Sequence, residues 1–123
     1  MPLRDVTYLD ARPSIEVGDL GAALAFWTDV VGFEVDTTMG EPPTFAMLSS
    51  RSAALALAEC DEPAIPAIAS VFVTMTGLDG LVERISAAGL TLESEPTTRP
   101  WGLRDLVVRC PGNGPFIAFG EQI

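Results

Sequence analysis

A short pattern of glycine, aspartate and leucine occurs twice in this chain. It reads VGDLGAAL at residues 17–24 and MTGLDGLV at residues 75–82. Each copy is followed by a second matching step, VVGFEV at residues 30–35 and AAGLTL at residues 87–92. An internal repeat of this kind is typical of a supersecondary unit that buries one sheet face poorly by itself. The two halves are therefore expected to fold alike and to pack together.

The hydrophobic pattern of each half predicts one helix among several strands. Residues 20–31 place apolar side chains at helical spacing, with Asp19 as the N-cap and Gly32 as the left-handed residue that ends the helix. Trp27 lies on the apolar face and is expected in the core. A second helix is expected at residues 78–88. The expected strands are residues 12–18, 33–39, 44–50 and 52–60 in the first half and residues 70–76, 90–96, 102–110 and 115–121 in the second.

This order of elements predicts an α+β fold. The chain is expected to form a single domain, residues 1–123, built from tandem βαβββ modules at residues 9–60 and 70–123. A proline-containing linker at residues 61–69 joins them. Laid side by side, the two modules are expected to form a curved, eight-stranded mixed sheet. The helices would lie outside this sheet and a concave ligand cleft inside it.

The charge balance is strongly acidic, with 17 acidic residues against 7 basic ones and a net charge of −10. Such a surface repels nucleic-acid phosphates, so no nucleic-acid partner is expected. It either attracts cationic ligands or simply keeps the protein soluble. No apolar run is long enough for a membrane helix, and the first residues lack a signal-peptide pattern. A cytoplasmic protein without a membrane partner is expected.

The chain contains no histidine. The serine and cysteine catalytic triads, and zinc or iron sites built from histidine, are therefore excluded. The two cysteines, Cys60 and Cys110, lie far apart and form no C-x-x-C pattern, so free thiols are expected. No glycine-rich nucleotide loop is present. Carboxylate acid–base chemistry, an all-oxygen metal site and plain binding remain open.

Three stretches resemble one known family. VGDLGAALAFWTDVVGFEV, GLDGLVERISAAGL and RPWGLRDLVVRCPGNGPFIAFGE are similar to conserved parts of the vicinal oxygen chelate superfamily, which includes glyoxalases, extradiol dioxygenases and bleomycin-resistance proteins. The resemblance covers residues 9–123. Within the superfamily, AFWTDVVGF and RPWGLRDLVVR look closest to the bleomycin-resistance proteins. That likeness implies a dimeric, non-enzymatic protein that sequesters a cytotoxic antibiotic.

Metal-dependent members of this superfamily hold their ion with residues that this chain lacks. Where they place a His, Gln or Glu early in the first strand, this chain has Arg12. Where they place a carboxylate near the end of the last strand, it has Ala118. The other ligand positions fall near Ala56 and near Val71 or Phe72, which are apolar. Neither a metal nor another cofactor is expected.

A binding cleft needs apolar and aromatic walls with a few polar anchors. The resemblance places Trp101 beside the drug, although the same residue could simply anchor its loop. Other candidates share a strand face, and the flexible thioether of Met39 could adapt to a flat ring system. The expected ligand-binding residues are Trp101, Gly102, Phe72, Thr74, Phe45, Met47 and Met39.

The leading hypothesis is a non-catalytic homodimer that sequesters an antibiotic. The ligand is expected to be a bleomycin-like antibiotic or, because the cleft contains few acids, a more hydrophobic polycyclic aromatic or enediyne natural product. The alternative is a metal-independent isomerase, cyclase or lyase on the same fold, with Glu16, Asp105 or Glu121 as a base. A sensor or interaction module without a small ligand is a third possibility.

Overall fold

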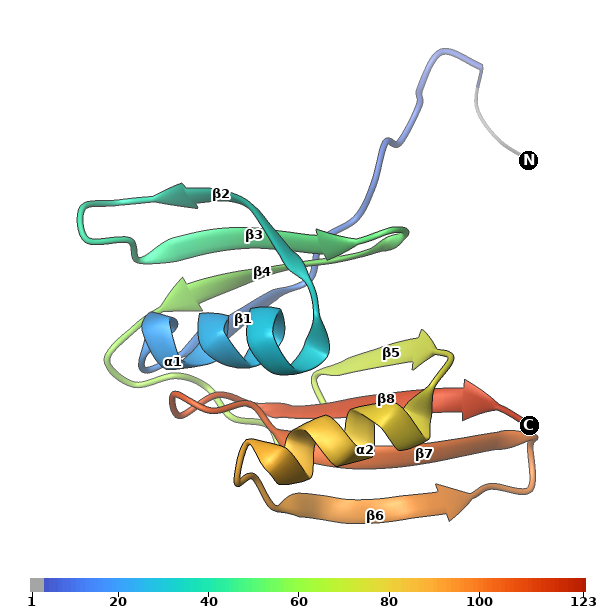
Figure 1. The fold of residues 1–123 in the computed structure, drawn as a ribbon. Coiled ribbons are helices and arrows are strands. Elements are labelled where there is room, and N and C mark those ends of the chain that lie inside the picture. Colours follow the sequence, from blue (N-terminus) through green and yellow to red (C-terminus); the bar gives the residue numbers. More distant parts are fainter. Residues whose placement is uncertain (1–3) are drawn as a thin grey trace.

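The two halves of the chain have the same order of elements in a computed structural model that describes residues 4–123 (Figure 1). The first half contains β1 (Ser14–Val17), α1 (Leu20–Ala25), η1 (Phe26–Val31), β2 (Glu34–Met39), β3 (Phe45–Ser50) and β4 (Ala53–Glu59). The second contains β5 (Val71–Met75), α2 (Leu78–Ala87), β6 (Leu92–Thr98), β7 (Leu103–Arg109) and β8 (Phe116–Gln122). The predicted α+β fold with two βαβββ units is confirmed.

Each half forms its own four-stranded mixed sheet. The strand orders are β1-β4-β3-β2 and β5-β8-β7-β6, and within each sheet the first pair is parallel and the other two are antiparallel. The expected continuous eight-stranded sheet is not present among the described residues of a single chain. The two sheets are instead separate, and buried residues from both halves form one shared hydrophobic cluster (Figure 1). Each sheet therefore has one face toward this core and one face turned away from it.

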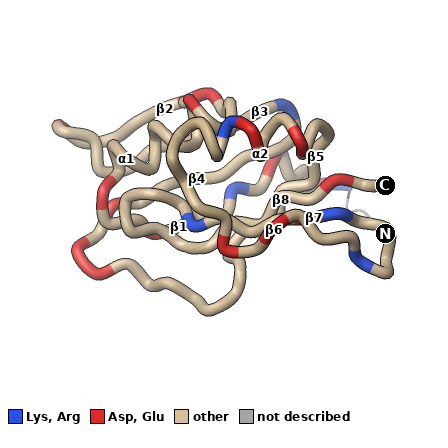
Figure 2. The backbone as a smooth tube through the Cα atoms, turned by 60° about the horizontal axis from the view of Figure 1, so that its bottom comes forward, with Lys and Arg blue, Asp and Glu red and all other residues tan. Residues whose placement is uncertain are grey.

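Acidic residues are spread along the whole chain, whereas basic residues are few (Figure 2). Three arginines form ion pairs among the described residues. These pairs join Arg12 to Asp36 at 2.8 Å, Arg99 to Asp105 at 3.1 Å, and Arg104 to Asp79 at 2.8 Å. The Arg99–Asp105 pair is the most shielded from water, because Asp105 is 6% exposed.

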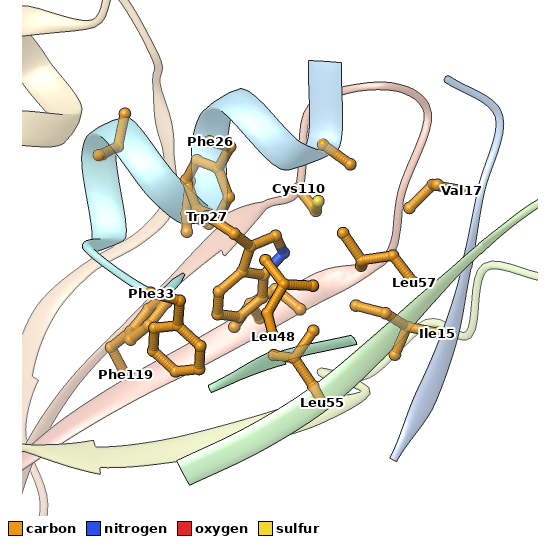
Figure 3. Packing of buried hydrophobic residues seen from close by; sticks show 14 of the residues in the cluster. Ile15, Val17, Phe26, Trp27, Phe33, Leu48, Leu55, Leu57, Cys110 and Phe119 are labelled. Atoms are coloured by element: carbon orange, nitrogen blue, oxygen red, sulfur yellow. The ribbon is translucent and has the colours of Figure 1, made fainter. Parts of the chain in front are cut away.

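Trp27 joins the two halves. It is fully buried, at 0% exposure, which confirms its predicted place in the core. Its ring packs edge-on against Phe26 and Phe33, with centroids 5.6 and 5.1 Å apart, and lies 6.1 Å from the ring of Phe119 on β8 (Figure 3). Edge-to-face and tilted aromatic pairs at these distances stabilise beyond the burial of area alone. One side chain of the first half is thereby fixed against the second sheet.

The indole nitrogen of Trp27 has no hydrogen-bond partner among the described residues. Figure 3 shows it turned toward Cys110, whose sulfur is at best a weak acceptor. Burial raises the pKa of the Cys110 thiol to about 12, and the indole lowers it by less. Cys110 is therefore a neutral thiol at physiological pH and acts as a small apolar residue of the core.

Both helices begin at a carboxylate from the last strand of their own half. Glu59 at the end of β4 accepts a hydrogen bond from the backbone N–H of Leu20, at 2.8 Å. Glu121 near the end of β8 accepts one from the N–H of Gly77, at 2.6 Å. Asp19 also accepts one from a backbone N–H in the first turn of α1, as predicted for an N-cap. Negative charge at a helix N-terminus is stabilising, so each helix is fastened to its own sheet.

The first helix ends differently from the regular helix predicted over residues 20–31. Its last six residues, Phe26–Val31, form wider π-helical turns. The N–H of Phe33 then donates to the carbonyl oxygen of Trp27 at 2.8 Å, and Gly32 ends the helix with a left-handed φ of 93°. Gly32 therefore has the predicted role. In residues 4–123 no helix is both long and apolar enough to cross a membrane.

Replacing Trp27 with alanine is expected to lower the free energy of unfolding by about 3–5 kcal/mol, because it removes a large buried ring and leaves a cavity. Urea unfolding followed by circular dichroism measures the change. Trp101→Ala is the matched control, since its side chain is 69% exposed. This control variant should lower the free energy of unfolding by no more than about 0.5 kcal/mol. Equal losses in the two variants would contradict a core centred on Trp27.

Candidate ligand-binding faces

The first candidate face is the side of the first sheet that points away from the core. Along β3, Ala46 and Leu48 are buried in the core, so Phe45 and Met47 point the other way. Phe45 is paired in register with Met39 on β2. These three predicted site residues therefore lie on one face, which we call the Phe45 face.

The second candidate face is the corresponding side of the second sheet. Val71, Val73 and Met75 of β5 pack against the core, so Phe72 and Thr74 point outward. Phe72 is 49% exposed. We call this the Phe72 face.

A glycine determines how the ring of Phe72 lies on this face. Gly120 of β8 is the register partner of Thr74. A Cβ atom at Gly120 would come within 2.6 Å of Cζ of Phe72. The ring therefore lies across the backbone of β8 in space that only glycine leaves open.

Trp101 and Gly102 lie in the tight turn between β6 and β7. Gly102 has a φ of 92°, a left-handed conformation that favours glycine. Its N–H donates to Arg99, and its carbonyl oxygen accepts from Ile123 near the end of the chain, at 3.2 and 3.1 Å. This turn is thus tied to β6 and to the C-terminus, while the indole of Trp101 remains in solvent. Gly102 shapes the turn, and the side chain of Trp101 is exposed.

The predicted site residues do not form one enclosed pocket in a single chain. They fall into the Phe45 face, the Phe72 face and the Trp101 turn. A hollow of about 270 Å³ along the seam between the sheets is lined by Phe72 and Thr74 from the second half and by Pro13 and Ala54 from the first. The Phe72 face therefore borders the first half along this seam.

The positions that bind a metal ion in related proteins do not offer suitable ligands in this chain. Arg12 is paired with Asp36, and the ion pair raises the pKa of Arg12 and lowers that of Asp36. Ser49 also donates to Asp36, at 3.0 Å. Ala56 and Ala118 offer no donor atom. Within residues 4–123 no three His, Cys, Asp or Glu side chains cluster closely enough to hold an ion. The donor chemistry of these residues therefore does not fit a metal ion.

The three carboxylates considered as catalytic bases each have a structural partner. Glu16 accepts from the N–H of Ala64 at 2.8 Å and thereby holds the linker against β1. Asp105 is paired with Arg99, and Glu121 accepts from the first turn of α2. Each carboxylate fastens two elements of the fold together. A general base needs a free lone pair directed at a substrate proton.

One further cleft was not foreseen. It has a volume of about 600 Å³ and lies between the end of the first helix, the β3–β4 turn, β5 and α2. Of the predicted site residues it contains Thr74 alone. Its other lining residues come from four segments that lie far apart in the sequence. Their spacing does not distinguish them from ordinary buried residues. No local motif in the sequence therefore indicates that they meet.

The sequence profile of the Glyoxalase/Bleomycin resistance protein/Dioxygenase superfamily matches residues 11–115. The chain belongs to this superfamily. Its fold supports the same assignment, because tandem βαβββ units with two mixed sheets are shared with solved members. A search of curated protein sequences found no match.

Among solved structures, TioX from Micromonospora sp. ML1 is 22% identical, with a TM-score of 0.71, over 92% of this chain and 99% of that one. The bleomycin-binding protein from bleomycin-producing Streptomyces verticillus, in complex with copper(II)-bleomycin, is also 22% identical, with a TM-score of 0.68, over 93% and 96% of the two chains. The fosfomycin resistance protein FosX from Listeria monocytogenes is 16% identical, with a TM-score of 0.74, over 96% and 95%. At these identities the likeness concerns the fold. That fold is shared by binding proteins and by enzymes.

Gly120→Ala is expected to lower the free energy of unfolding by about 1–3 kcal/mol, because the new methyl group displaces the ring of Phe72. In a Phe72→Ala background the same change should cost less than about 0.5 kcal/mol. Urea unfolding of the four proteins gives the coupling between the two positions.

Gly80→Ala serves as the control, since a Cβ there meets nothing within 4 Å and lies in a helix. It should stabilise the protein by about 0.5–1 kcal/mol. An equal cost of Gly120→Ala in both backgrounds would show that the ring of Phe72 does not rest on this glycine.

Proposed function

We propose that this protein binds a flat, hydrophobic antibiotic and releases it unchanged. The observation that supports this most is the exposure of large apolar side chains away from the core. Trp101, Phe72 and Met39 are 69%, 49% and 54% exposed. Exposed apolar residues on sheet faces opposite a complete core favour a binding role. The likeness in fold to a bleomycin-binding protein also supports a binding role.

The chemistry of these faces favours a polycyclic aromatic or enediyne natural product over a highly cationic one. An aromatic ring stacked on Trp101 or Phe72 contributes about 0.5–1.5 kcal/mol beyond area burial. The acid on the Phe72 face, Asp105, is already neutralised by Arg99. Asp36, near the Phe45 face, is likewise paired with Arg12. Both of these acids are therefore already paired with an arginine. Glu16, whose register partner Ala58 also pairs with Phe45, lies on the Phe45 face and has no arginine partner among the described residues.

Binding without chemistry is also favoured by the state of the carboxylates. Glu16, Asp105 and Glu121 hold the linker, an arginine and a helix N-terminus, respectively. In each of them, at least one carboxylate oxygen is already engaged in a contact that fastens two parts of the fold together. The positions where related proteins hold a metal carry Arg12, Ala56 and Ala118 in this chain, and these side chains do not supply a carboxylate base either.

We further propose that the ligand site is completed by a second copy of the chain. Within one chain the Phe45 and Phe72 faces belong to two separate sheets. A symmetric dimer can place the Phe45 face of one copy opposite the Phe72 face of the other, and it does so twice. Seven candidate residues that are scattered in one chain would then line two equivalent clefts.

Trp101→Ala is expected to weaken the binding of an anthracycline or an anthraquinone-fused enediyne by about 1–3 kcal/mol, with the fold intact. Fluorescence titration measures this, and Trp101→Phe should retain most of the affinity because it keeps a stacking surface. Raising the salt concentration should change the affinity little. Unchanged binding by Trp101→Ala would refute the stacking role, and mass spectrometry showing an altered drug would establish an enzyme.

Multi-angle light scattering is expected to give twice the monomer mass at micromolar concentration. Calorimetric titration should then give two ligands for each dimer. A monomer that binds the antibiotic one-to-one with full affinity would show that one chain suffices. The dimer proposal would then be wrong, while the stacking proposal would stand.

A further inference from the structure

The 600 Å³ cleft is distinct from the two candidate faces. Its apolar walls come from the core side of β5 and from both helices, including Val30, Phe33, Met75 and Leu81. It is large enough for a small organic molecule, since ligand clefts commonly measure about 300–1,000 Å³. It shares only Thr74 with the residues assigned to antibiotic binding.

The charged residues of this cleft are all of one sign. Arg51 in the β3–β4 turn and Arg84 on α2 line it, and no Asp or Glu does. The chain has 17 acidic residues and only 7 arginines, so a lining with two arginines and no acid runs against its composition. The local charge of the cleft is thus opposite to the net charge of the protein.

Neither arginine is neutralised by a carboxylate within residues 4–123. Arg12, Arg99 and Arg104 form the ion pairs of the described structure, and Arg51 and Arg84 form none. Arg84 makes one long hydrogen bond, from its Nη1 to the carbonyl oxygen of Val30, at 3.5 Å. Both guanidinium groups therefore retain donors for a ligand.

Hydroxyl groups border the same cleft near the arginines. Ser50 and Ser52 flank Arg51 in the chain, and Thr76 follows the end of β5. A hydroxyl can donate a hydrogen bond to an anion next to a guanidinium. The cleft therefore combines an apolar wall with a polar, positively charged rim.

We propose that this cleft binds an amphipathic anion, a small molecule with an aromatic or branched apolar body and one carboxylate. The apolar body packs against Val30, Phe33 and Leu81, and the carboxylate lies between Arg51 and Arg84. Arginine recognises carboxylates through paired N–H donors, which gives orientation as well as attraction. The net negative charge acts from farther away and is screened over about 8 Å at physiological salt, so the two arginines dominate inside the cleft.

The test compares 2-naphthoate with its neutral analogue 2-naphthalenemethanol by calorimetric titration. Naphthoate is expected to bind at least about fivefold more tightly than the alcohol, since charged hydrogen bonds contribute more than neutral ones. Arg51→Met and Arg84→Met should each weaken the binding of naphthoate by about fivefold or more and leave the binding of the alcohol nearly unchanged. Both side chains are exposed, so neither change endangers folding.

Arg104→Met is the matched control, because it removes the same charge but does not line the cleft. It should change naphthoate binding less than twofold, as should Trp101→Ala. Spectra of protein labelled at the Leu, Val and Met methyl groups should shift at Val30, Met75 and Leu81 on adding naphthoate. Equal binding of acid and alcohol, equal effects of Arg84→Met and Arg104→Met, or shifts at Met47 instead would overturn the proposal. Because Trp101→Ala tests only the antibiotic site, failure of one proposal is distinguishable from failure of the other.

Discussion

The packing of Trp27 against Phe119 determines how this molecule is arranged. A βαβββ unit has one apolar sheet face, and that face must be covered. Here the two units cover each other's apolar faces through a shared core with the indole at its centre. The opposite faces are consequently left in solvent, and the exposed aromatic residues follow from this arrangement.

The repeat made the order of elements predictable from the sequence. Glycines 32 and 89, the apolar spacing of the two helices and the alternation along β5 all indicated the correct element types. The pairing between the units could not be predicted, because a strand with one apolar face shows the same pattern whichever surface covers it. The π-helical turns of Phe26–Val31 were also missed, since they depend on tertiary packing around Trp27 and not on local spacing.

The candidate site was predictable only in part. Alternation correctly placed Phe72 with Thr74, and Phe45 with Met47, on a shared face of their strand. It could not show that Gly120 makes room for the ring of Phe72, because that contact joins residues far apart in the sequence. The ion pair between Arg12 and Asp36 was missed for the same reason. Arg12 was recognised only as a residue unable to bind a metal, whereas in the fold it ties the start of β1 to β2.

Glu59 and Glu121 have a consequence for how the chain can assemble. Each carboxylate joins the last strand of a unit to the helix of the same unit, so neither contact crosses the linker. Two copies could therefore exchange whole units without losing either contact. The exchange would replace the Trp27–Phe119 contact within one chain by the same contact between chains. The energetic difference between the closed and the exchanged arrangement would then depend mainly on the linker, where Glu16 and the N–H of Ala64 form the bond that would have to be remade.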